Sequence, residues 1–102
     1  MQDEILNIFK TKINRALKNR VKKIILFGSR ARGDNAPDSD YDVLLVLDEI
    51  SPEIKKLINN LEGEILYDHN AVFSAFPYTF KDIERRKYDP FIINAQKEGK
   101  EL

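Results

Sequence analysis

Residues 21–47 read VKKIILFGSRARGDNAPDSDYDVLLVL, and this stretch decides the fold. Its two apolar runs, Val21–Phe27 and Tyr41–Leu47, are rich in β-branched and other large apolar residues, which favours buried β-strands. The polar segment between them, Ser29–Ser39, contains Gly and Pro and is predicted to form a turn or a short helix. Asp42 is the only charged residue inside the second strand, so this part of the chain needs a functional explanation.

Asp40 and Asp42 lie at the mouth of the second strand and inside it. Removing a carboxylate from water costs several kcal/mol unless a hydrogen bond, an opposite charge or a metal compensates. Side chains two positions apart on a strand point to the same face, so the two carboxylates are expected side by side. Mg²⁺ takes one or two carboxylates and completes its shell with water and substrate phosphates. The pair therefore predicts metal-dependent phosphate chemistry.

Gly28-Ser29 lies where the first strand ends and the chain turns. A glycine there lets a phosphate approach the backbone, while the N–H groups and the Ser29 hydroxyl can donate to its oxygens. Nucleotidyl transfer needs mainly positioning and charge neutralisation. Gly28-Ser29 and the pair Asp40 and Asp42 together predict a nucleotide-binding site.

Outward from this stretch, the pattern predicts further helices and one more strand. Apolar spacing indicates an amphipathic helix over residues 3–18, and Ser51-Pro52 is a helix start whose helix we expect to end at Gly63. A third strand is predicted over His69–Phe76, with Pro77 ending its pairing. Two short helices follow, at 79–86 and from Asp89-Pro90 to Gly99. The order predicts one α/β (α+β) domain spanning residues 1–102, with a small mixed β-sheet backed by helices.

Composition narrows the class of protein. The chain is 42% hydrophobic and 33% charged, which suits a folded, well-solvated domain. Its formal net charge is zero, which argues against direct binding of a nucleic acid. No apolar run approaches bilayer length, the N-terminus lacks signal-peptide features and Cys is absent. The expectation is a cytoplasmic protein without a membrane partner.

The two halves of the motif, residues 28–33 (GSRARG) and 39–43 (SDYDV), resemble the DNA polymerase β-like nucleotidyltransferase superfamily, specifically its minimal nucleotidyltransferase (MNT) antitoxin branch. The leading helix and the C-terminal residues 90–99 are also typical of small members. The resemblance implies the polymerase β-like nucleotidyltransferase fold, with ATP as substrate and two Mg²⁺ ions bound by Asp40 and Asp42. It also implies a third carboxylate on a neighbouring strand. Asp68 is the only nearby candidate, and Asn70 cannot replace it as a base.

The remaining predicted site residues contact the triphosphate. The resemblance implies that Ser29 holds it, with Gly28 and Ser39 in the same nucleotide-binding set. Arg30 and Arg32 can bind phosphate, or can pair with surface acids such as Asp34.

Three functions remain open. In the first, AMP is transferred from ATP to a hydroxyl acceptor, which the resemblance implies is a tyrosine of a HEPN-domain toxin, with this chain as the antitoxin. In the second, the chain is a nucleotide-binding antitoxin that neutralises its toxin by occlusion; a missing third carboxylate favours this function. In the third, it is an aminoglycoside-type nucleotidyltransferase with a small-molecule acceptor, which requires a homodimer interface.

Overall fold

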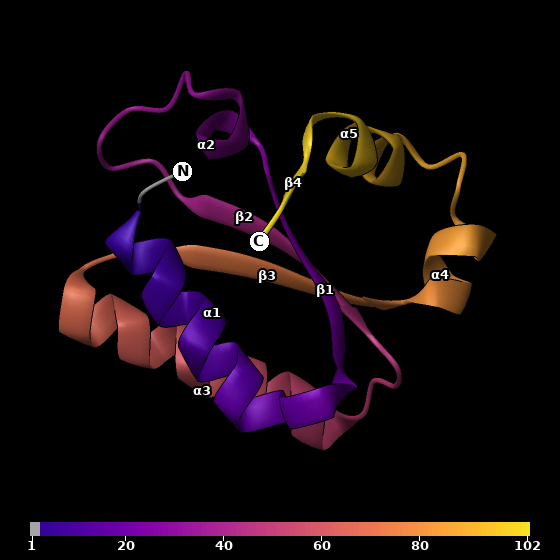
Figure 1. The fold of residues 1–102 in the computed structure, drawn as a ribbon, viewed down its shortest axis with the longest axis horizontal. Helices are drawn as coiled ribbons and strands as arrows, with labels where there is room; N and C mark the ends of the chain where they lie inside the picture. The colour runs from indigo at the N-terminus through magenta and orange to yellow at the C-terminus, as the bar shows by residue number, and fades with distance from the viewer. Residues whose placement is uncertain (1–2) are drawn as a thin grey trace.

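The computed structural model describes residues 3–102, folded as one mixed sheet between two helical layers (Figure 1). The sheet order is β3-β2-β1-β4; β1 pairs antiparallel with β2 and β4, and β2 pairs parallel with β3. The elements are α1 (Glu4–Leu17), a 3-10 turn (Lys18–Arg20), β1 (Val21–Phe27), α2 (Ser29–Arg32), β2 (Tyr41–Leu47), α3 (Pro52–His69), β3 (Phe73–Thr79), α4 (Phe80–Arg85), α5 (Pro90–Glu98) and β4 (Lys100–Glu101). The predicted mixed sheet backed by helices is confirmed, with β1 and β2 at the predicted bounds.

One face of the sheet is covered by α1 and α3, which lie side by side in Figure 1. α1 begins after Asp3, whose carboxylate accepts hydrogen bonds from the N–H groups of Ile5 and Leu6 and so satisfies two free donors at the helix start. The core beneath these helices takes alternate residues of β2 together with the apolar stripes of both helices, including Phe9, Ile13, Val43, Leu45, Ile58 and Ile65. Burial of these side chains provides most of the driving force for folding.

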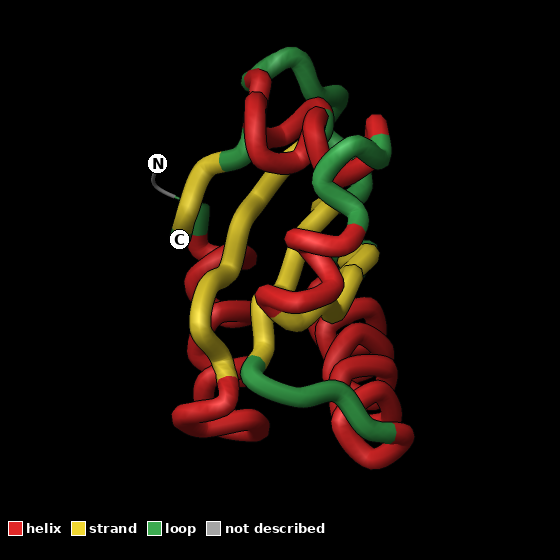
Figure 2. Tube along the Cα trace, turned by 90° about the vertical axis from the view of Figure 1, so that its right-hand side faces the viewer, coloured by secondary structure: helices red, strands yellow, loops and turns green. Residues whose placement is uncertain are grey.

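The opposite face is covered mainly by α5. Leu44 and Val46 of β2 point into this smaller core with Phe27 and Ala95, and Phe76 and Phe91 pack at its edge. β2 is therefore apolar on both faces, which explains why its sequence reads as a continuous hydrophobic run. Figure 2 is turned by 90° from Figure 1 and shows helical segments crossing in front of the strands. Asp42 is on the α5 side, because it alternates in phase with Leu44 and Val46.

Two predicted boundaries are wrong. α3 does not end at Gly63 but continues to His69 and ends where Asn70 adopts a left-handed conformation with φ 53°. A glycine in a helix costs only about 1 kcal/mol, and burial of Ile65 two residues later outweighs that cost. The third strand accordingly begins at Phe73 and not at His69.

Pro77 also lies within β3 and does not end it, contrary to prediction. The Tyr41 N–H donates to the Val72 carbonyl, so the backbone polar groups of alternate residues 73, 75 and 77 point away from β2. Pro77 therefore lacks an N–H only on the free edge of the sheet, where no partner strand needs one. On the same edge, the Ala75 N–H donates to Glu62 Oε2 of α3 at 2.8 Å. Burial raises the pKa of Glu62, against the effect of this hydrogen bond.

Within residues 3–102, no helix has the length and apolar character needed to cross a membrane.

Candidate functional site

The turn from β1 into α2 brings Gly28 against Asp42. Gly28 adopts φ +78° and ψ −162°, a conformation that is essentially restricted to glycine. A Cβ atom built there would lie 2.5 Å from Asp42 Oδ2. The missing side chain therefore provides room for a carboxylate of the neighbouring strand, in addition to any phosphate. The two halves of the predicted motif meet at this contact.

Asp42 is half-buried between two neighbouring strands. In register it lies opposite Phe27 of β1 and beside Ser74 of β3. Burial, followed by the charge of Asp40, raises the pKa of Asp42. Asp40 is exposed and lies just before β2, two residues ahead of Asp42. The side-by-side placement of the two carboxylates stays a prediction. A cation bound by Asp40 and Asp42 would offset both the burial of the Asp42 charge and its repulsion by the Asp40 charge.

Asp68 lies in the last turn of α3, where it is exposed, and not on β3. Ser74 occupies the β3 position beside Asp42, where a third acid would stand. No group of three or more His, Cys, Asp or Glu side chains that could hold a metal gathers anywhere in residues 3–102. Asp40 and Asp42 alone still fit Mg²⁺, which is often held by two carboxylates with phosphate oxygens completing its shell. The assignment of Asp68 to the site stays a prediction.

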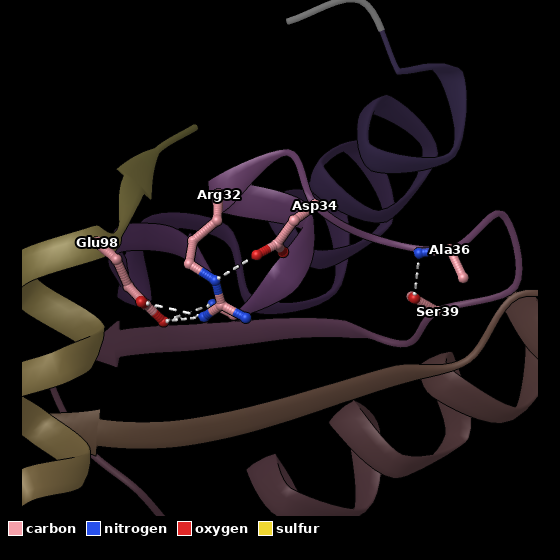
Figure 3. A network of polar contacts seen from close by, with 6 residues as sticks. Arg32, Asp34, Ala36, Ser39 and Glu98 are labelled. Atoms are coloured by element: carbon pink, nitrogen blue, oxygen red, sulfur yellow. Dashed lines mark hydrogen bonds and ion pairs between the residues drawn. The ribbon is translucent and has the colours of Figure 1, made fainter.

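Arg32, at the end of α2, is held by acids on both sides (Figure 3). Its Nε donates to Asp34 Oδ2 at 3.2 Å, and its NH1 donates to both oxygens of Glu98 at 3.1 Å. Glu98 Oε1 also accepts the Gly28 N–H at 3.1 Å. Arg32 is thus linked through Glu98 to the glycine that contacts Asp42.

Arg30 is directed away from Asp42. Its guanidinium stacks over the Tyr41 ring, 3.9 Å from the centroid, and the Tyr41 ring lies in the core beneath α1 and α3. Its Nε donates to the Ser39 carbonyl at 2.9 Å and its NH2 to the Pro37 carbonyl at 3.0 Å. The Ser39 hydroxyl in turn accepts the Ala36 N–H (Figure 3). Arg30 and Ser39 therefore organise the loop that carries Asp40.

A stack of planar groups anchors this loop to the core. Tyr41 stacks on Phe73 at 4.5 Å between centroids, and Phe73 stacks on Phe9 at 4.4 Å. The Tyr41 hydroxyl donates to Asp3 Oδ2 at 3.0 Å. Burial, and then this hydrogen bond, raises the pKa of Tyr41. The residue between the two aspartates is thus fixed from three directions.

Replacing Arg30 with lysine is expected to destabilise the fold by about 1 kcal/mol, because lysine loses the planar stack and one of the two carbonyl contacts. Urea unfolding measures this difference. Arg15→Lys, at an exposed position of α1, is the matched control and should change stability little. Equal effects of the two substitutions would contradict the role given to Arg30.

The match to a protein-family model decides the family. The model of the nucleotidyltransferase domain matches residues 3–102. The chain belongs to the nucleotidyltransferase domain family.

Two curated relatives come from Methanocaldococcus jannaschii. "Putative protein adenylyltransferase MJ0141" is 45% identical over 53 residues, covering 52% of this chain and 52% of the relative. "Putative protein adenylyltransferase MJ0604" is 51% identical over 45 residues, covering 44% of this chain and 41% of the relative. The matched part of this nucleotidyltransferase domain thus spans about half the length of these relatives or less.

Solved structures share the fold of this nucleotidyltransferase domain. A toxin-antitoxin crystal structure with AMP-PNP has a TM-score of 0.61 and 14% identity, covering 91% of this chain and 68% of that chain. A mutant of the toxin-antitoxin MntA-HpeT has a TM-score of 0.63 and 17% identity, covering 99% of this chain and 72% of that chain. At these identities the likeness concerns the fold, and it confirms the predicted fold class.

Glu98, which the sequence does not predict, contacts Gly28 and Arg32 of the candidate site of this nucleotidyltransferase domain. It follows Gly28 by 70 positions, and a single Glu before a glycine carries no chemical pattern. Only the packing of α5 across the sheet brings it to the Gly28 N–H.

Proposed function

We propose that this nucleotidyltransferase domain transfers AMP from ATP to a hydroxyl group of a partner protein, with Mg²⁺ as cofactor. The observation that carries the proposal is the contact between the Gly28 backbone and the Asp42 carboxylate, with Asp40 two residues before Asp42 in the chain. This arrangement offers anionic metal ligands next to backbone that has no side chain. A metal-bound triphosphate needs both features.

Each residue has a definite task in this proposal. Asp40 and Asp42 would hold Mg²⁺, which when bound neutralises charge on the phosphates. The N–H and hydroxyl of Ser29, the first residue of α2, would donate to phosphate oxygens. Arg32 would bind the phosphates that leave, since guanidinium groups recognise phosphate in a bidentate manner. Arg30 and Ser39 would act by holding the loop and not by touching the nucleotide.

The reaction follows from this placement. The acceptor oxygen forms a bond to the α-phosphorus while the bond from that phosphorus to the bridging oxygen breaks. Pyrophosphate leaves with the bonding electron pair, and the proton of the acceptor hydroxyl is released to solvent. The chain contributes orientation and charge compensation.

We propose a tyrosine of a HEPN-type toxin as the acceptor, which would make this chain the antitoxin of the pair. The name protein adenylyltransferase of the two archaeal relatives supports a protein acceptor. Toxin-antitoxin complexes among the structures that share the fold support a toxin as the partner. Exposed aromatic side chains, including Tyr67, Phe80 and Tyr88, offer apolar contact area for a protein.

A second candidate is a nucleotide-binding antitoxin that blocks its toxin without catalysis. The observation that favours it is Ser74, because a hydroxyl stands beside Asp42 where a third carboxylate would bind metal or take a proton.

Incubation with α-labelled ATP, Mg²⁺ and the partner toxin tests the first candidate. Label is expected on the toxin with the wild type and none with Asp40→Asn/Asp42→Asn, since two metal ligands are lost. Asp68→Asn tests the third predicted carboxylate, which is exposed on α3. Loss of transfer in this variant would support Asp68 as a site residue, and retained transfer would exclude it. A tight complex without any transfer would favour occlusion.

A further inference from the structure

The carboxylate of Glu98 occupies a place that suits an anion. It accepts the Gly28 N–H at 3.1 Å. It also pairs with Arg32 NH1 at 3.1 Å (Figure 3). A backbone N–H at a glycine turn and a guanidinium are the donors that nucleotide-binding sites present to phosphate. Glu98 is the last residue of α5, so the anion comes from the chain itself.

The same place borders the proposed metal site. Gly28, which donates to Glu98, is the residue whose Cα faces Asp42 Oδ2. A triphosphate bound at Gly28-Ser29 would bring further negative charge beside Glu98, Asp40 and Asp42. It would also compete with Glu98 for the NH1 group of Arg32, which is already bound to both Glu98 oxygens.

We propose that Glu98 is a built-in competitor of the triphosphate: it holds Arg32 in the nucleotide-free protein and is displaced when phosphate takes its place. This inference rests on the proposed nucleotide site. Glu98 thereby sets the nucleotide affinity without contacting nucleotide. The ion pair is open to water, with side-chain exposures of 46% for Arg32 and 27% for Glu98, so exchange for a phosphate is unobstructed.

The backbone around Glu98 is anchored on both sides, so only the side chain needs to move. A Cβ on Gly99 would collide with the Ala95 carbonyl oxygen and with Ile25 Cγ2, which shows how closely the chain packs there. Beyond it, β4 pairs with β1, and the Leu102 N–H donates to the Ile24 carbonyl at 2.8 Å. Nucleotide binding should therefore leave hydrogen exchange at the Leu102 amide unchanged.

Titration calorimetry with Mg²⁺ and a non-hydrolysable ATP analogue tests the proposal. Glu98→Gln keeps an oxygen that can accept the Gly28 N–H but removes the charge that holds Arg32. The dissociation constant is expected to fall by about two- to fivefold, the range of an exposed ion pair. Glu101→Gln is the matched control, because it removes one negative charge from the same end of the chain at an exposed residue outside the Arg32 contacts. It should change the affinity less.

The Arg32→Met background separates competition from a general charge effect. There, Glu98→Gln should leave the affinity unchanged, because the shared guanidinium is gone. If the wild type binds the analogue and Glu98→Gln binds it equally or more weakly, the competitor role is wrong and the proposed function stands. If neither protein binds the analogue, the competitor role and the proposed function are both wrong. If only Glu98→Gln binds it, the competitor role is supported.

Discussion

Replacing Asp42 with asparagine is expected to abolish Mg²⁺-dependent nucleotide binding while leaving the fold as stable as the wild type, or more so. Asparagine keeps the size of the side chain but removes the charge of half-buried Asp42, whose ionised form is disfavoured by burial and by the charge of exposed Asp40. Allowing for solvent around both groups, the gain in the free energy of unfolding should not exceed about 1 kcal/mol. Calorimetric titration and urea unfolding measure the two effects.

The gain in stability should depend on pH. Burial and the charge of Asp40 raise the pKa of Asp42 in the folded state above its unfolded value. The folded state therefore binds the proton of the Asp42 carboxyl group more tightly than the unfolded state does. The stability that this proton contributes is fully present below the unfolded pKa and is lost as pH rises through the folded pKa. The advantage of Asp42→Asn should be largest at neutral pH and should disappear below the ordinary range of an aspartate.

Asp48→Asn is the control for this substitution, because Asp48 is an exposed carboxylate just beyond the opposite end of β2. It should leave nucleotide binding unchanged. Unchanged nucleotide binding by Asp42→Asn would refute the metal pair.

Replacing Gly28 with alanine is expected to destabilise the fold by at least about 3 kcal/mol and to remove nucleotide binding. Two costs add up. The backbone conformation at φ +78° and ψ −162° is strained for any residue with a Cβ, and the new methyl group would lie 2.5 Å from Asp42 Oδ2. Chemical denaturation measures the loss of stability.

Gly33 provides the matched control. It also has a positive φ, +83°, but a Cβ there would meet nothing within 4 Å. Gly33→Ala should therefore cost only about 1–2 kcal/mol, from backbone conformation alone. The double variant Gly28→Ala/Asp42→Ala should regain the stability lost to crowding between the new methyl group and Asp42. The stability lost to backbone strain at residue 28 should not return. Equal costs at the two glycines would show that Gly28 and Asp42 are not in contact.

The first two strands were predictable because their signal is local. Most residues of Val21–Phe27 and Tyr41–Leu47 are apolar, and both ranges match the structure. Gly63 and Pro77 were wrongly predicted to end their elements, because tertiary packing decides whether a glycine or a proline ends a helix or a strand. Gly63 stays helical through the burial of Ile65 beyond it, and Pro77 stays in a strand because its missing N–H faces the free edge.

The proximity of Gly28 and Asp42 was also predictable, whereas the longer-range contacts around them were not. Gly28 follows the end of one strand and Asp42 lies near the start of the next, so antiparallel pairing of these strands is enough to bring them together. The contacts of Glu98 with Gly28, and of Tyr41 with Asp3, join residues 70 and 38 positions apart. No periodicity or motif encodes such pairs, which depend on how α5 and α1 pack on the sheet.

The free edge of β3 has a consequence for assembly. An uncovered strand usually invites another chain to extend the sheet, by partner recruitment or by aggregation. Here the outward Ala75 N–H is occupied by Glu62, and Pro77 two residues later has no hydrogen to offer. A strand arriving at this edge would lose two consecutive ladder donors. A partner that meets this edge must therefore recognise side chains, and self-polymerisation through β3 is blocked at its centre.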